Sequence, residues 1–528
     1  MTHNTTHNAR IAAALAAILV VTPALAGCGN VTSDGQGESA GANAQASEAQ
    51  AIPYDEQRAA LLVQSPPTEQ LSPDEQRVSD QLEAMKSEAD VLFGNVAYGV
   101  DDWGEQASDQ SRLHRFMEAM PKGGDLHAHG IELLSFDALM GVLLARDDVL
   151  VCLDEGADYG KLYVAGTEGV PEGAQPLKEA LGIREQGPDQ GEDEAFGYEE
   201  EPPALTTETL RDLLTMRGGT DSSTAWTNLS TLLSRTYGLH ASAGLLTRLY
   251  EAGLRERCDD GASLVEVRLL MSASDEQNAT ELGALRDAYY AVKRDYPNLV
   301  VRVIGCASKG QGTSTEDACG ALRSVIRLSA QIRDESDSHN PRNFVVGLDL
   351  TGDEDTSHPL SEYVDFLSSK EVTESGLHLL LHCGESLRVN NESVADAYLL
   401  KATRIAHGLN LYRYPDLMEA YKSSQVAIEV CPISNYRMGY TNDLRFHPGQ
   451  IYLRNGNPMV LASDDALFQE PCPLTDDFFA AALCWDLSLS EIKSLCRNSI
   501  TYSGLFQEET GRLMAAWESD WNAFIAAQ

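Results

Sequence analysis

From residue 225 onward, short apolar runs alternate with longer amphipathic stretches, and this alternation limits the fold more than any other feature of the chain. The amphipathic stretches, such as 225–254 and 281–296, have the periodicity of helices, and the apolar runs have the length and composition of buried strands. With a short run near the start, eight strands are predicted, at 124–126, 264–270, 299–304, 344–350, 377–381, 403–406, 426–430 and 459–461. Eight strands that alternate with helices predict an α/β fold with a parallel (β/α)8 TIM barrel rather than an open sheet.

The barrel is expected to span residues 116–528, with an acidic insertion at about 150–205 after the first strand. Acidic runs at 191–194 and 198–201 favour a solvated loop, and the alternative is a lid or a partner-binding segment. Residues 53–115 form a predicted N-terminal helical extension, in which Ser72-Pro73-Asp74-Glu75 matches a helix capping box.

The N-terminus resembles an export signal. Arg10 precedes an apolar run at 11–21 that is too short for an ordinary membrane span. Leu25-Ala26-Gly27-Cys28 resembles a bacterial lipoprotein box, which predicts a signal peptide at 1–27 and lipidation of Cys28. The alternative is a plain secretory signal. Residues 28–52 have the composition of a flexible tether, so we expect an exported protein, anchored outside by lipid alone or secreted.

The net charge of −41, from 80 acidic and 39 basic residues, would repel nucleic acid and anionic lipid. It also argues against a polyanionic substrate, whereas a neutral small molecule would meet no such repulsion. We therefore expect no nucleic-acid partner.

Four predicted strands end in groups that bind metals or transfer protons. The first ends in His127-Ala128-His129, the fifth in His382-Cys383-Gly384-Glu385, the sixth in His407 and the eighth in Ser463-Asp464-Asp465. Alternate residues of a strand point the same way, so His127 and His129 can reach one metal. Any single histidine would more often be structural. Since the strands of such a barrel end at one face, four such groups favour a catalytic zinc site.

The chemistry of these residues suggests roles. Zinc lowers the pKa of bound water towards ~7 and so supplies hydroxide for attack on an electron-poor carbon. Glu385 is a candidate proton donor, and His407 could orient or deprotonate the water. Asp465 could bind a polar edge of the substrate.

Together these segments resemble the adenosine deaminase family, in particular its secreted growth-factor-like branch. The resemblance covers roughly residues 112–510. The matching segments are MPKGGDLHAH at 120–129, LVEVR at 264–268, VGLDLTGDE at 346–354, HCGE at 382–385, RIAHG at 404–408, EVCPISN at 429–435, DLRxHP at 443–448 and PMVLASDD at 458–465.

The resemblance implies a role for each matching residue. One Zn²⁺ per chain would be bound by four ligands: His127, His129, His382 and Asp464. Glu385 would protonate N1 of a purine nucleoside and His407 would assist the water. Asp465 would contact N7 and the backbone N–H of Gly352 would contact N3, so that adenosine or deoxyadenosine loses ammonia at C6. A homodimer formed through residues 53–115 is also implied.

One departure from the family bears on the sugar. Many relatives carry Asp directly after the second histidine, where it contacts the ribose, but this chain has Gly130. Glu132 or a residue of the insertion could substitute. Two alternatives therefore stay open: a deaminase of another 6-aminopurine compound, and a non-catalytic cell-surface interaction protein. We expect Glu266 and Arg268 to brace the barrel interior rather than to touch substrate.

Overall fold

The computed structural model describes residues 58, 69–98, 111–154, 156–183, 204–216, 221–310, 312–336, 342–470 and 474–528. The predicted signal peptide, Cys28, the tether and both acidic runs of the insertion lie outside these residues. Among the helices that are described, none is both long enough and apolar enough to cross a membrane.

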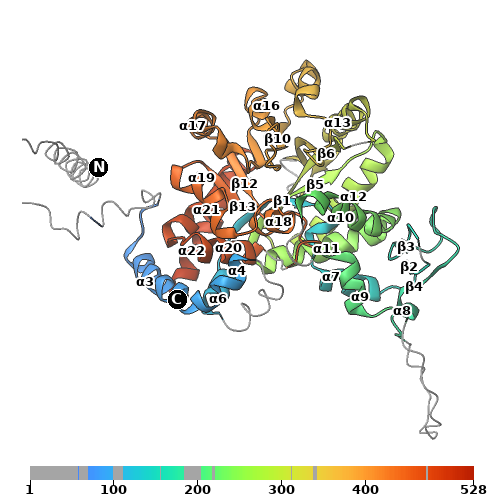
Figure 1. Ribbon diagram of the computed structural model, residues 1–528, viewed down its shortest axis with the longest axis horizontal. Helices are drawn as coiled ribbons and strands as arrows, with labels where there is room; N and C mark the ends of the chain where they lie inside the picture. The colour runs from blue at the N-terminus through green and yellow to red at the C-terminus, as the bar shows by residue number, and fades with distance from the viewer. Residues whose placement is uncertain are drawn as a thin grey trace, which may run out of the picture. The chain divides into compact units, whose positions relative to one another are not determined.

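Eight parallel strands form a nearly closed barrel, which confirms the predicted TIM-barrel fold (Figure 1). They follow one another around the sheet in chain order. The ring is joined at its ends by a parallel bridge between Ala128 and Asp464, where the Asp464 N–H donates to the His127 carbonyl at 2.8 Å. The strands are β1 (Gly123–His129), β5 (Ala262–Leu270), β6 (Val300–Ser308), β9 (Val345–Thr351), β10 (His378–Cys383), β11 (Arg404–His407), β12 (Ala427–Val430) and β13 (Met459–Leu461).

Helices surround this barrel because each has an apolar face that packs on the strands or on a neighbouring helix (Figure 1). Their starts follow from local sequence: Ser242, Ser274 and Ser314 each cap a helix by accepting from a backbone N–H. The main helices are α11 (Ala243–Asp259), α12 (Asp275–Lys293), α13 (Thr315–Ser329), α16 (Ser393–Leu399), α17 (Pro415–Ser423), α18 (Pro432–Arg437), α19 (Gly449–Asn455), α20 (Leu474–Cys484), α21 (Leu489–Thr501) and α22 (Gln507–Ala527).

The insertion after β1 is more ordered than its sequence suggests. Its first part forms a small antiparallel sheet, and the expectation of a solvated loop is wrong there. The reason is two short apolar runs that the acidic composition hides, in which Val149, Val151, Leu162 and Val164 are all buried. The insertion contains β2 (Val149–Cys152), β3 (Leu162–Val164), β4 (Ala174–Pro176) and α8 (Leu177–Ala180). It is preceded by α7 (Phe136–Leu144) and followed by α9 (Thr207–Leu214) and α10 (Ser222–Thr236).

The N-terminal extension contains helices that pack on the last helices of the barrel. In α3 (Pro73–Ala89) the capping box is present as predicted, with Ser72 and Glu75 each accepting from the other's backbone N–H. Glu75 also accepts from Trp521 Nε1 at 2.7 Å and lies 2.7 Å from Lys493, so this residue of the capping box connects α3 to α21 and α22. The other helices here are α4 (Phe93–Ala97) and α6 (Arg112–Ala119).

Candidate active site

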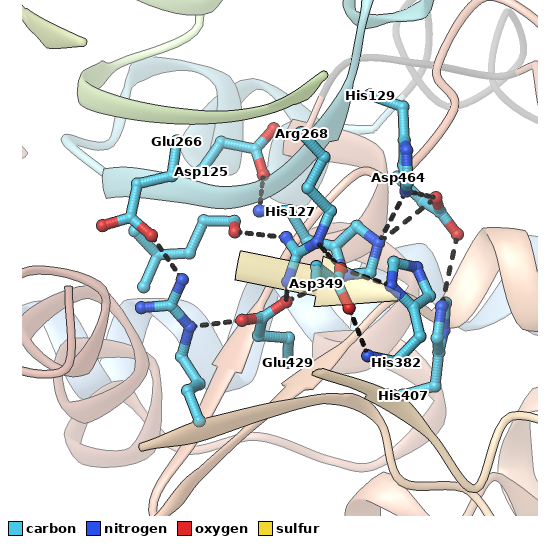
Figure 2. Close-up of polar contacts among 12 residues, drawn as sticks. Asp125, His127, His129, Glu266, Arg268, Asp349, His382, His407, Glu429 and Asp464 are labelled. Atoms are coloured by element: carbon cyan, nitrogen blue, oxygen red, sulfur yellow. Dashed lines mark hydrogen bonds and ion pairs between the residues drawn. The ribbon is translucent and has the colours of Figure 1, made fainter. Parts of the chain in front are cut away.

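The predicted site residues meet at the carboxyl ends of the barrel strands (Figure 2). His127 and His129 come from β1, His382 and His407 from the ends of β10 and β11, and Asp464 from the segment after β13. The ring centroid of His127 lies 4.8 Å from that of His382 and 4.9 Å from that of His407. Segments remote in sequence therefore present imidazoles to one small volume.

The spacing of the donor atoms fits a metal ion. Nε2 of His127 lies 3.1 Å from Nε2 of His129, and each lies 3.5 Å from Oδ1 of Asp464. Two ligands of a tetrahedral zinc, each bonded at ~2.0–2.2 Å, are roughly 3.4 Å apart. His127, His382 and His407 also offer donor atoms that all lie within 4.8 Å of one another. The other three predicted ligands, His129, His382 and Asp464, are thus gathered around His127.

Hydrogen bonds outside the cluster fix how two of the imidazoles face it. His127 Nδ1 is 2.8 Å from Glu429 Oε2, and His382 Nδ1 is 2.6 Å from Asp349 Oδ2. Each carboxylate accepts from Nδ1, which leaves Nε2 free of a proton and directed at the cluster. Carboxylates in this position also make a histidine a better ligand.

These two carboxylates belong to a row of buried ion pairs across the barrel interior, named here the charge ladder: Glu266, Arg404, Glu429, Arg268 and Asp349 (Figure 2). Arg268 lies 2.9 Å from Asp349 and 2.7 Å from Glu429, and Arg404 contacts both Glu266 and Glu429. All five side chains are fully buried. Burial alone would raise the pKa of Glu429, but the two arginines lower it, so the carboxylate stays charged. The ladder confirms the bracing predicted for Glu266 and Arg268.

Two carboxyl groups beside the cluster, Glu385 and Asp465, form no ion pair with an arginine or lysine of the described residues, and for Glu385 the lowering effect of Lys309 on the pKa is outweighed. Burial raises the pKa of Glu385 well above its usual value, and the neighbouring carboxylates of Asp464 and Glu354 raise it further. Burial and Asp464 do the same to Asp465. Glu385 Oε1 lies 3.8 Å from His407 Nε2. The arrangement favours a neutral Glu385 that can donate a proton.

Backbone strain is concentrated at the same place. His407 and Asp464 have φ angles of 63° and 61°, in the left-handed region that residues with a side chain rarely adopt. Such conformations persist where the surrounding structure holds them, which occurs most often at functional sites.

The cluster lies at the base of a cavity of about 750 Å³, a size usual for a small-molecule site. Of the predicted site residues, all but His127 line it: His129, Gly352, His382, Glu385, His407, Asp464 and Asp465. Its outer part is lined by residues that the sequence did not single out, among them Trp226, Tyr237, His240 and Glu281. They come from α10, from the 3-10 turn Tyr237–Ala241 and from α12, and no local motif marks them.

Glu132 occupies the space beside Gly130. A Cβ added at Gly130 would lie only 2.6 Å from Glu132 Oε2, and φ of Gly130 is +29°. Glu132 is buried and lines the cavity. Burial raises its pKa to about 7, although His240 opposes the shift. In this part of the cavity lining, the carboxylate therefore belongs to Glu132 and not to the residue at position 130.

Comparison with known proteins identifies relatives of this chain. The family model described as "Adenosine deaminase" matches residues 196–517, more than half of the chain. Adenosine deaminase 2 of Dictyostelium discoideum is 28% identical over 441 residues, which cover 79% of this chain and 75% of that protein.

Solved structures share the fold. An adenine deaminase from Arthrobacter aurescens aligns with a TM-score of 0.52 at 18% identity, covering 76% of this chain and 98% of that one. An amidohydrolase from Burkholderia ambifaria with bound zinc aligns with a TM-score of 0.50 at 14% identity, covering 79% and 95%. At these identities the likeness concerns the architecture.

Proposed function

The chain belongs to the adenosine deaminase family, and we propose on that basis that it is a zinc-dependent aminohydrolase acting at the cell surface. In the proposed reaction, adenosine or deoxyadenosine and water give inosine or deoxyinosine and ammonia. The observation that carries the proposal is the buried Glu385, 3.8 Å from His407 Nε2, beside a cluster of histidines and Asp464 that fits a metal.

We assign His127, His129, His382 and Asp464 as the ligands of one zinc ion. Bound there, zinc would supply the Lewis acidity that activates water at neutral pH. The zinc-bound amidohydrolase of the same fold supports this choice of metal, as does the mixed nitrogen and oxygen donor set. Ser434 Oγ donates to Asp464 Oδ2 at 2.7 Å, which holds this carboxylate toward the histidines.

The remaining site residues act on the purine. Glu385 donates its proton to N1, which makes C6 electron-poor enough for attack. Asp465 binds N7, and because its pKa is raised it can donate to that nitrogen. The backbone N–H of Gly352 binds N3 and so fixes the position of the ring. His407, whose Nε2 lies 3.8 Å from Glu385 Oε1 and 3.9 Å from Asp464 Oδ2, assists the water.

The cavity favours a neutral nucleoside over a nucleotide. Glu132, Glu281 and Asp353 line it alongside Glu385 and the Asp464–Asp465 pair. A phosphate would be repelled by Glu281 and Asp353, whereas sugar hydroxyls can donate to carboxylates of the cavity wall. We assign Glu132, which fills the space beside Gly130, to the sugar.

Export and assembly complete the proposal. Residues 1–27 are proposed as a signal peptide, Cys28 as the lipidated residue and 28–52 as a tether, with plain secretion as the alternative. A homodimer through residues 53–115 is proposed from the family resemblance.

The test is ammonia release by the purified chain from residue 29 with zinc, given adenosine, deoxyadenosine, adenine, methylthioadenosine or AMP. Rapid turnover of adenosine or deoxyadenosine by the wild type, but not by Glu385→Gln, is the expected result. Turnover of another aminopurine alone would favour the second candidate, a deaminase of another 6-aminopurine compound. The presence of Gly130 where many family members have Asp supports that candidate. Absence of turnover despite one bound zinc per chain would overturn the proposal.

A further inference from the structure

The two ring nitrogens of His407 have different surroundings. Nε2 faces the cavity, 3.8 Å from Glu385 Oε1 and 3.9 Å from Asp464 Oδ2. Nδ1 lies 3.2 Å from Nδ2 of the buried Asn435 on α18. A neutral imidazole has one N–H and one bare nitrogen, so the position of its proton decides whether it can donate to water or remove a proton from it.

The position of the His407 proton is set by the backbone N–H of Gly449, which acts through His447 and Asn435. The N–H of Gly449 donates to Nδ1 of His447 at 2.9 Å, and since an N–H cannot accept, this Nδ1 carries no proton. His447 is fully buried, and burial lowers its pKa to about 3, so the ring is neutral. Its single proton is therefore on Nε2.

From His447 the direction of each hydrogen bond follows. His447 Nε2 lies 3.0 Å from Asn435 Oδ1, an oxygen that accepts its proton. This fixes the Asn435 amide, so its NH₂ group is the one that meets His407 Nδ1. A nitrogen that accepts from an amide is bare, and the proton of neutral His407 is then on Nε2, inside the cavity.

We propose that Asn435 and His447 are positioning residues that hold His407 as a hydrogen-bond donor at Nε2, so that His407 orients the attacking water and does not remove its proton. This inference rests on the proposed function and refines it. Acceptance of the proton of the water falls to a carboxylate, and that of Asp464 lies 3.9 Å from His407 Nε2.

The packing around His447 supports a fixed chain of donors. Reversing the Asn435 amide would turn its NH₂ group toward the N–H of His447, and shifting that proton to Nδ1 would oppose the Gly449 N–H. The close approach of this amide depends on glycine: a Cβ at Gly449 would lie 3.0 Å from His447 Nδ1 and 2.9 Å from Trp485 Cη2. The His447 ring also packs on Trp485, with centroids 5.4 Å apart.

The test reads the proton position directly. Long-range ¹H–¹⁵N correlation spectra of the zinc-loaded chain, labelled with ¹⁵N at histidine, distinguish bare from protonated ring nitrogens, and His407→Gln assigns the signals. We expect His407 to show a protonated Nε2 and a bare Nδ1. A protonated Nδ1 in the wild type would overturn the assignment, whether or not the enzyme turns over adenosine.

Matched variants then separate positioning from folding. In Asn435→Asp a carboxylate that only accepts faces both imidazoles, so His407 Nδ1 should gain the proton and kcat should fall by about tenfold or more, with little change in KM. His447→Gln keeps a donor for Asn435 and should retain the wild-type spectrum and most of kcat, whereas His447→Leu should lose both.

The outcomes are distinguishable from failure of the proposed function. A reversed proton position in Asn435→Asp with unchanged kcat on adenosine would show that His407 needs no fixed proton, and would overturn the inference alone. A wild type with the expected spectrum that turns over no aminopurine would overturn the proposed function and the role given to His407, while the hydrogen-bond directions would stand.

Discussion

Two groups of buried charges lie side by side in this barrel, and they differ in whether their charges are matched. In the charge ladder, each arginine lies between two carboxylates and each contact is an ion pair. In the cluster, Asp464 also lies 3.5 Å from both His127 and His129, but like groups are packed together as well: His127 and His129 through their Nε2 atoms at 3.1 Å, and Asp464 beside Asp465 and Glu385. Every contact within the ladder joins opposite charges, whereas a bound cation would relieve the contacts between like groups in the cluster.

The two groups are also connected. Glu429 and Asp349 belong to the ladder and at the same time bind Nδ1 of His127 and His382. The ion pairs of the charge ladder thus hold two histidines of the cluster in place. This suggests that substitutions in the ladder act first on stability, and substitutions in the cluster act first on activity.

The largest effect is expected at Glu385, the buried acid beside the cluster. Glu385→Gln removes the proton donor without changing its volume, so kcat for adenosine should fall by about 10²–10⁴-fold. Steady-state ammonia release measures it, with zinc content as the control. A variant that binds zinc and keeps more than a tenth of wild-type kcat would contradict the assigned role.

Breaking the ladder should affect stability instead. Arg404→Met leaves Glu266 and Glu429 buried without one of their cations, which should lower the free energy of unfolding by about 3–5 kcal/mol. Denaturant unfolding measures this loss. The matched control is Arg323→Met, which removes an exposed ion pair with Glu371 and should cost about 0–1 kcal/mol. Equal losses in the two variants would refute the contrast between the two regions.

Substitution of a residue that connects the charge ladder to the cluster should affect both stability and metal binding. Asp349→Asn keeps an acceptor but removes the charge that holds His382, so zinc affinity should fall by about 10–100-fold. Competition with a chelator measures the affinity. Unchanged affinity with lowered stability would assign Asp349 to the ladder alone.

The smallest effect is expected at Glu132, the residue proposed to bind the sugar. Glu132→Gln weakens a hydrogen bond worth about 1 kcal/mol, so KM for adenosine should rise by about fivefold with kcat nearly unchanged. Kinetics with 2′-, 3′- and 5′-deoxyadenosine would show which hydroxyl is involved. The control is Glu256→Gln, which lies outside the cavity and binds Ser135. An identical preference among these nucleosides in wild type and variant would count against a sugar contact.

The sequence predicted those parts of the molecule that depend on local pattern. All eight barrel strands were predicted, seven of them because each contains a short apolar run between helical stretches, and β1 as a short segment before the first histidines. His127 and His129 could be paired because a strand alternates, and the ends of different strands could be brought together because a parallel barrel has one carboxyl face.

What the sequence did not predict depends on contacts between distant segments. The approach of Glu132 to the space beside Gly130 depends on the backbone of Gly130, and the role of His447 depends on Asn435, which belongs to another element. Trp226 lines the cavity because α10 packs over it, yet its sequence resembles that of any amphipathic helix. The sheet β2–β4 was missed because acidic composition was given more weight than the two short apolar runs.

The closure of the barrel has a consequence for biosynthesis. The ring is joined where Asp464 meets β1, and nearby Ser463 donates to Asp125 at 2.5 Å across 338 residues of sequence. Contacts of such long range have a high entropic cost of loop closure, which slows folding. A nascent chain that ends before residue 464 has neither a closed ring nor the complete donor set. We therefore expect a product truncated before residue 464 to be inactive, because it lacks both the closing bridge and the Asp464 carboxylate.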